Sequence, residues 1–195
     1  LAKAFLILIA CHTSQLLEEL RVLKGKKYKN SELENTTRML DYVGKSFSGY
    51  DYALARHTLQ VISRRVVEQL ESYDIVLLPV TSKPPPLIGS LRPKFTDELI
   101  NSIVMNLKLG WIFRVPLIRD AILQKLAPEN LWFSPDTLLQ NATGQPAINI
   151  PSYWTDKGIP VGTQFVSKIG DEASLIGLAS QIEEIASWKH RIPTL

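Results

Sequence analysis

Between residues 50 and 80, a helical pattern of apolar residues gives way directly to an unbroken apolar run. The first part has apolar residues at steps of four, three, four and four: Ala55, Leu59, Ile62, Val66 and Leu70. This spacing predicts one amphipathic helix over residues 50–72. The run Ile75–Val80 shows no alternation with polar residues and is β-branched at three positions, which predicts a strand buried on both faces. A helix followed by such a strand is typical of an α/β fold.

Length and composition indicate a globular chain. The 195 residues are enough for one ordinary domain and too few for two well-packed ones, so we expect a single domain over residues 1–195. Hydrophobic residues make up 45% and charged residues 21%, which excludes a disordered or low-complexity chain. The 22 basic residues exceed the 19 acidic ones by only three and are interspersed with them. We therefore expect no nucleic-acid partner.

The N-terminal apolar stretch leaves two interpretations open. Ala4–Cys11 is far shorter than the roughly 20 residues of a membrane helix, so no membrane partner is expected. Lys3 followed by Leu8–Cys11 is similar to a bacterial lipoprotein signal, but signal peptides run to roughly 15–30 residues. A buried strand or the start of a helix is favoured. Cys11 is the only cysteine, which excludes an internal disulfide and favours a reducing, cytoplasmic location.

Capping signals divide the first fifty residues. Thr13 or Ser14 is predicted to begin a short helix that ends near Gly25, carrying leucines at 16, 17, 20 and 23. Lysines at 24, 26, 27 and 29 follow, for which a solvated turn is favoured over a binding patch. Residues 31–34 have the pattern of a capping box, which predicts a helix from there to about Val43. A break is expected over residues 46–49.

The second half of the chain alternates between loops, helices and a hairpin. Residues 81–93 hold four prolines and predict a loop without a regular hydrogen-bond ladder. Helices are predicted over residues 96–109 and 117–126. Residues 147–150 and 161–166 are predicted as strands joined by a turn at 156–158, and a last helix over 172–186. Its expected apolar face is Leu175, Leu178, Ala179, Ile182 and Ile185.

No catalytic or metal site emerges from the residue patterns. The three histidines, His12, His57 and His190, have no spacing suited to metal ligands, and neither a metal nor a cofactor is predicted. No serine is followed three residues later by lysine, and there is no Gly-x-Ser-x-Gly elbow. Gly44-Lys45-Ser46 has no glycine five residues earlier, which excludes a phosphate-binding loop. The apolar surroundings of Cys11 predict an inert thiol.

Four stretches, in this order and spacing, together resemble the C-terminal part of the amidase signature family. They are Tyr73–Thr81, Asn141–Pro151, Gly158–Val166, and Gly170–Ala173 with Trp188. Ser48–Tyr50 and the long helix extend the resemblance over most of the chain. Within the family, the chain looks most similar to bacterial amidases of the aminohexanoate cyclic-dimer hydrolase type. The resemblance implies a mixed sheet flanked by helices and an enzyme that hydrolyses small-molecule amides.

The same resemblance implies that the catalytic residues lie outside this sequence. The family uses a lysine, a cis-serine and a nucleophilic serine, the last two in a Gly-Gly-Ser-Ser-Gly stretch of the N-terminal half. This sequence contains no Gly-Gly and no Ser-Ser pair, and the lysine motif is missing. We therefore expect a partial domain without the catalytic core, inactive alone, whose partner is the missing N-terminal half. The resemblance assigns five residues to the wall of the substrate pocket: Thr81, Asn141, Thr143, Gly144 and Gln145.

Glycines and prolines of the motif have expected packing roles. Gly144 is predicted to turn the backbone where a Cβ would clash, and Gly162 to let two backbones approach closely. Pro146 and Pro151 are expected to bracket a short strand and stop further pairing.

Two other functions remain open at this stage. One is a fragment of the amidase-like component of a glutamyl- or aspartyl-tRNA amidotransferase, which shares the fold and chemistry. The other is a non-catalytic interaction domain on the same scaffold. A fragment would also leave strand edges and an apolar face uncovered, so we expect the isolated chain to self-associate.

Overall fold

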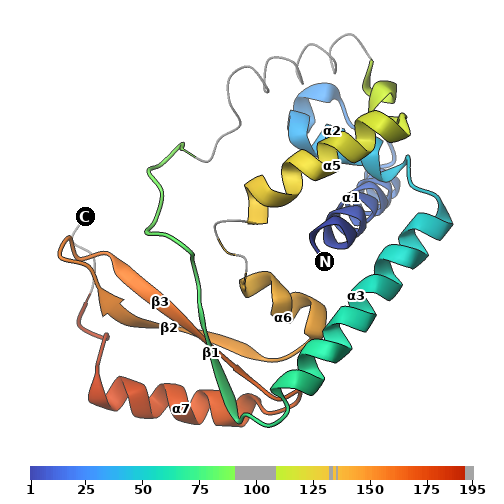
Figure 1. The fold of residues 1–195 in the computed structure, drawn as a ribbon. Coiled ribbons are helices and arrows are strands. Elements are labelled where there is room, and N and C mark those ends of the chain that lie inside the picture. The colour runs from blue at the N-terminus through green and yellow to red at the C-terminus, as the bar shows by residue number, and fades with distance from the viewer. Residues whose placement is uncertain (91–108, 132–133, 135, 192–195) are drawn as a thin grey trace. The chain divides into compact units, whose positions relative to one another are not determined.

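A computed structural model describes residues 1–90, 109–131, 134 and 136–191 (Figure 1). The chain divides into two compact units, which are described one at a time. Unit 1 comprises Leu1–Leu59 and Leu87–Leu131, and unit 2 comprises Gln60–Pro86 and Trp132–Leu195. No helix within the described ranges has both the length and the apolar character needed to cross a membrane.

Unit 1 begins with one uninterrupted helix, α1 (Ala2–Lys24). The predicted helix start at Thr13 or Ser14 is wrong, because both hydroxyls are used within the helical packing. Thr13 Oγ1 donates to the carbonyl of Ile9 at 2.8 Å, and Ser14 Oγ donates to the carbonyl of Asp41 at 2.9 Å. The predicted end at Gly25 is confirmed, and this glycine adopts the left-handed conformation with φ 68°.

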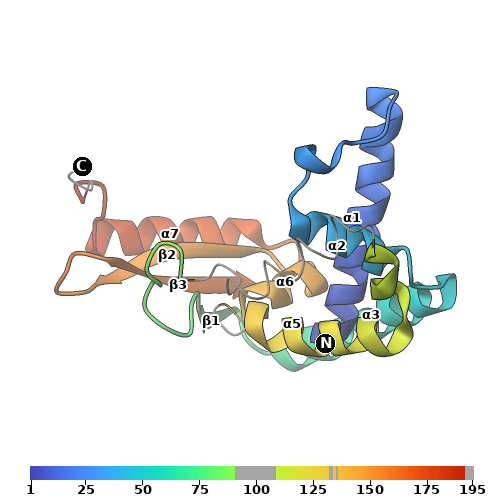
Figure 2. The same ribbon diagram turned by 90° about the horizontal axis from the view of Figure 1, so that it is seen from above.

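Helix α2 (Asn35–Gly44) packs against α1, and the two lie side by side in both views (Figure 1, Figure 2). It begins four residues later than the capping pattern predicts. Residues 30–32 form a short 3₁₀ turn instead, closed by the bond from Lys29 N to Glu32 Oε2 at 2.7 Å. Ala10 on α1 and Val43 on α2 are fully buried between the helices. At Gly44 an added Cβ would overlap the Ala10 carbonyl and Ser14 Oγ, so the contact requires glycine.

Helix α3 (Gly49–Leu70) confirms the prediction from the apolar stripe. A reciprocal capping arrangement fixes its start, which explains the break predicted before it. Ser48 N and Ser48 Oγ donate to Asp51 Oδ2 at 2.8 and 2.7 Å, and Asp51 N donates to Ser48 Oγ at 3.1 Å. These bonds, first that from the Ser48 hydroxyl, lower the pKa of Asp51.

The remaining described elements of unit 1 are the 3₁₀ helix η2 (Gly110–Arg114) and helix α5 (Pro116–Leu131). Helix α5 confirms the helix predicted over residues 117–126 and extends further at its C-terminal end. The helix predicted over residues 96–109 lies almost entirely outside the described residues. Loop character is confirmed for the described part of the proline-rich stretch, residues 81–90.

Unit 2 contains a three-stranded antiparallel sheet with the order β1-β3-β2. The strands are β1 (Ile75–Pro79), β2 (Ala147–Trp154) and β3 (Pro160–Ser167). The predicted hairpin is confirmed, but the prediction that Pro151 ends its first strand is wrong. Strand β2 continues to Trp154 because a register shift between Pro151 and Tyr153 absorbs the missing N–H.

Two helices cover opposite faces of this sheet (Figure 1). Helix α7 (Glu172–Ile185) buries Leu175 against Ile150 and Phe165 on one face. The short helix α6 (Thr137–Thr143) reaches the other face, where Gln164 Nε2 donates to Gln140 Oε1 at 2.7 Å. The apolar face predicted for α7 is confirmed except for Ile185, which is exposed at the end of the helix.

Strand β1 departs from its prediction. The apolar run predicts burial on both faces, but β1 is an edge strand and the side chain of Leu77 is 60% exposed. The described sheet is also wholly antiparallel, whereas the expected sheet was mixed. The α/β class is confirmed.

Candidate functional site

The candidate site begins where helix α6 turns into strand β2. Gly144 ends α6 in the left-handed conformation, with φ 75°, and its N–H donates to the Gln140 carbonyl at 2.8 Å. An added Cβ would meet no atom beyond the neighbouring residues within 4 Å, so the predicted clash is one with the local backbone only. The positive φ alone favours glycine here.

Gln145 fixes the turn to the end of strand β3. Its backbone N–H donates to Thr143 Oγ1 at 3.3 Å, and its side-chain Nε2 donates to the Ser167 carbonyl, also at 3.3 Å. Ser167 N in turn donates to the Pro146 carbonyl at 3.2 Å. The Gln145 side chain is buried, and its Oε1 has no hydrogen-bond partner among the described residues. A buried acceptor of this kind is suited to an N–H donor from another group.

A groove of about 490 Å³ lies beside this turn, between the C-terminal part of α3 and the end of β3. Its lining residues are Ser63, Arg64, Val67, Glu68, Leu70, Glu71, Thr143, Gln145, Lys168 and Ile169. The two cations and two carboxylates balance, so the groove favours a neutral polar ligand over a strongly charged one. Ser63 Oγ donates to the Ala142 carbonyl at 2.8 Å and thereby ties α3 to α6.

The structure brings together only some of the five predicted pocket residues. Thr143 and Gln145 line the groove, and Gly144 lies between them. Asn141 is exposed on α6 and is not among the lining residues. Thr81 follows β1 at the opposite end of the sheet, because Ile75 pairs with Ser167 while Pro79 pairs with Thr163. The five paired residues separate these ends by roughly 13 Å.

Eight of the ten lining residues have no counterpart in the sequence-based prediction, among them the polar residues Ser63, Arg64 and Lys168. Arg64 lies off the apolar stripe of α3, which indicates only a non-core position. Ser63 is a small polar residue buried within a helix. Its burial and its hydrogen bond to Ala142 are known only from the structure, so the sequence gives no sign of its place in the groove.

Gly162 has a different role from the predicted one. An added Cβ would overlap the Asn149 side-chain amide on the neighbouring strand, so the glycine accommodates a side chain and not a second backbone. Asn149 and Gln164 are direct partners in the β2–β3 ladder. The motif therefore places two amide side chains on the sheet face that α6 approaches.

Replacing Gln164 by methionine is expected to destabilise the protein by about 1–3 kcal/mol, because the buried amide of Gln140 then loses its only partner among the described residues. Replacing both glutamines should be close to neutral, since no buried amide is left unpaired. A double-mutant cycle by urea unfolding measures this coupling. Strictly additive losses would contradict it.

Within the groove, no hydroxyl is hydrogen-bonded to a side-chain base. The Ser63 proton is engaged by a backbone carbonyl, and no group of three or more metal-ligating side chains is present in the described ranges. In unit 1, burial, and secondarily the charge of Asp51, raises the pKa of the Cys11 thiol. This thiol lies 3.8 Å from the Gly44 carbonyl oxygen. The arrangement can bind a ligand but has no assembled nucleophile and base.

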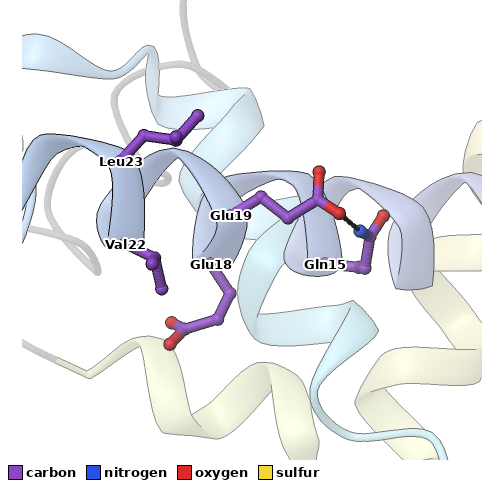
Figure 3. A pocket seen from close by; sticks show the side chains of 5 residues that line it. All are labelled: Gln15, Glu18, Glu19, Val22 and Leu23. Carbon is purple, nitrogen blue, oxygen red and sulfur yellow. Dashed lines mark hydrogen bonds between the residues drawn. The ribbon is translucent and has the colours of Figure 1, made fainter.

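Two hollows in unit 1 are less suited to a ligand. One lies on the exposed side of α1 and is lined by side chains of that helix alone (Figure 3). Gln15 donates to Glu19 there, and Val22 and Leu23 are exposed (Figure 3). The other is lined by residues of α1, α2 and the segment between them, and at least two of its four cations are paired: Arg21 with Glu18, and Lys45 with Asp41 at 2.8 Å. These pairs compensate much of its positive charge.

Comparison with known proteins identifies the family. The sequence profile of the family named Amidase matches residues 9–176. The chain is 28% identical over 169 residues to AmiC of Mycobacterium leprae, which is classed among the amidases, covering 86% of this chain and 30% of AmiC. It is 30% identical over 134 residues to an amidase-class protein of Synechocystis, covering 69% of this chain and 21% of that protein.

A solved structure of 6-aminohexanoate cyclic dimer hydrolase has a similar fold, with a TM-score of 0.72 and 21% identity. The match covers 96% of this chain and 35% of the hydrolase. The chain thus spans between about a fifth and a third of the length of these proteins. The profile match over most of its length nevertheless decides the family, and the chain belongs to the amidase family.

Proposed function

We propose that this chain is the C-terminal part of an enzyme that hydrolyses carbon–nitrogen amide bonds, and that it is inactive alone. The observation that carries the proposal is the family match over residues 9–176 in a chain that spans only 21–35% of the relatives described above. The missing Gly-Gly and Ser-Ser pairs support a position outside the catalytic part. The engaged hydroxyl of Ser63 at the groove agrees with this.

In the complete enzyme, the family's chemistry implies a lysine that deprotonates a bridging cis-serine, which activates the nucleophilic serine. The nucleophile attacks the amide carbonyl, the amine leaves, and water then releases the acid from the acyl-enzyme. Backbone N–H groups of the missing part would stabilise the oxyanion. None of these groups is assigned to a residue of this chain.

This chain would contribute scaffold and pocket wall. The groove beside Thr143 and Gln145 supports that role, since it is charge-balanced and has a buried amide acceptor at its wall. An amide substrate carries both an N–H donor and a carbonyl acceptor, which suits such a surface. Asn141 and Gly144 would support the turn. Thr81, at the other end of the sheet, would have to contact a different part of the substrate or none.

A fragment of a tRNA-dependent amidotransferase is the second candidate within the family, and the near-neutral charge balance gives it no particular support. A non-catalytic interaction domain is the third. A coding sequence that continues upstream of Leu1 into a Gly-Gly-Ser-Ser-Gly motif would favour an enzyme over the interaction domain.

The purified 195-residue chain is expected to release no product from a simple aryl amide above the buffer rate. The physical reason is the absence of an activated nucleophile, without which the amide keeps its uncatalysed barrier. Release of the coloured aniline is followed by absorbance, with a complete amidase of the family as positive control. Turnover comparable to that control would contradict the proposal.

A further inference from the structure

The groove in unit 2 has its charges arranged along one face of helix α3. Arg64, Glu68 and Glu71 follow one another at steps of four and three residues, which is the spacing of one helix face. Glu71 N donates to the Glu68 carbonyl at 3.4 Å, so the turn continues through Glu71. At a rise of about 1.5 Å per residue, the backbone of Arg64 lies roughly 6 Å from that of Glu68 and roughly 10 Å from that of Glu71 along the axis. This wall of the groove therefore has a positive end and a negative end.

The negative end is suited to a cation. Within the described ranges, neither Glu68 nor Glu71 takes part in an ion pair. Arg64 precedes Glu68, which is the less favourable order for a pair four residues apart. Helix α3 has no basic residue in its last turn, and the negative end of the helix dipole disfavours carboxylates there. A cationic group of a ligand would relieve both the mutual repulsion of these carboxylates and their repulsion by the dipole.

Gln145 gives an independent sign of a ligand in the same groove. It lines the groove and is only 8% exposed. Its Nε2 donates to the Ser167 carbonyl, which fixes the orientation of the amide, and its Oε1 has no partner among the described residues. A buried acceptor without a donor is costly, and an N–H group of a ligand would satisfy it. The groove thus offers three groups to a nitrogen donor, of which one is buried.

The positive end is suited to a carboxylate. The guanidinium of Arg64 is planar and presents parallel N–H donors that match the two oxygens of a carboxylate. Lys168 is the second cation of the groove and pairs with Asp74 at 3.5 Å. Because the Asp74 side chain is 98% exposed, this pair contributes little and leaves Lys168 able to exchange partners.

We propose that the groove binds a zwitterion whose ammonium group lies at Glu68 and Glu71 and whose carboxylate lies at Arg64. Such a ligand has no net charge, which agrees with the balance of cations and carboxylates along the groove. The volume of about 490 Å³ is that of a small-molecule site. The inference rests on the proposed function and names the class of substrate: amides built from amino acids that keep a free ammonium end and a free carboxylate end.

A series of small probes tests the need for both charges. The 195-residue chain, isotopically labelled, is titrated at neutral pH with 5-aminopentanoate and followed by NMR. The extended chain of this probe separates its charges by about one helical turn. Pentanoate lacks the ammonium group, pentylamine lacks the carboxylate, and glycine holds its charges too close together. Each of these is expected to bind about tenfold or more weakly than 5-aminopentanoate, because a charged contact is lost.

Substitutions at the two ends of the groove locate the site. Glu68→Gln and Arg64→Gln are each expected to lower the affinity for 5-aminopentanoate about fivefold or more. Arg64→Gln should also abolish the preference for 5-aminopentanoate over pentylamine. The matched controls are Glu184→Gln on α7 and Arg65→Gln on α3, at exposed positions that do not line the groove, and they should change the affinity less than about twofold. All four positions are exposed, so circular dichroism should show every variant folded.

The results that would overturn the inference are absence of saturable binding, equal binding of pentanoate, pentylamine or glycine, and equal losses in the groove variants and their controls. The aryl amide assay is independent of these titrations. Absence of both binding and turnover would overturn the inference and leave the proposed function intact. Binding of 5-aminopentanoate by a chain that also turns over the aryl amide would contradict the proposed function and leave the assignment of the groove intact.

Discussion

Replacing Gly44 by alanine is expected to lower the free energy of unfolding by about 2–4 kcal/mol. The added methyl group would overlap the Ala10 carbonyl and Ser14 Oγ, and the first of these is backbone that moves only with helix α1. Separating the helices would weaken the bond from Ser14 to the Asp41 carbonyl and open the contact at Ala10 and Val43. Urea unfolding followed by circular dichroism measures the loss.

Gly177→Ala is the matched control for this change. Gly177 lies inside helix α7, and an added Cβ there would meet nothing within 4 Å. The substitution should therefore stabilise the protein by about 0.5–1 kcal/mol through reduced freedom of the unfolded chain. Equal changes in the free energy of unfolding for the two substitutions would show that the close contact at Gly44 does not affect stability.

Replacing Ile150 by alanine is expected to lower the free energy of unfolding by about 2–5 kcal/mol. Ile150 is 2% exposed and packs with Phe165 and Leu175 between strand β2 and helix α7. Its truncation leaves a cavity that the paired strands cannot readily close. Ile176→Ala, on the exposed side of the same helix at 66% exposure, should change the free energy by less than about 0.5 kcal/mol. A loss at Ile150 no larger than that at Ile176 would rule out this core.

Local patterns predict the helices of this protein better than their boundaries. The stripe from Ala55 to Leu70 specifies α3 because one face of it is apolar at helical spacing. The division predicted at Thr13 and Ser14 fails because hydroxyls can bond within a helix or to a neighbouring one, and only the packed structure distinguishes these choices. The late start of α2 has the same origin, since Glu32 caps a separate turn.

The apolar composition of β1 predicts a strand buried on both faces. Composition cannot show whether other segments of this chain cover those faces. Leu77 shows this limit most directly. The residues of the candidate site likewise fall into those predicted from a local motif and those that only the tertiary structure reveals. Gly144 and Gln145 follow from a local motif, whereas Ser63 and Lys168 join them only because α3 and β3 come together in unit 2. Thr81 shares the resemblance but lies at the far end of the sheet.

The order β1-β3-β2 has a consequence for how the chain is made. Strand β1 pairs with residues more than eighty positions further along the sequence, whereas β2 and β3 are joined by a short turn. At roughly 5–20 residues per second, β1 leaves the ribosome several seconds before β3, the strand with which it pairs, has been made. We expect the local hairpin of β2 and β3 to form first, and β1 to pair with it afterwards.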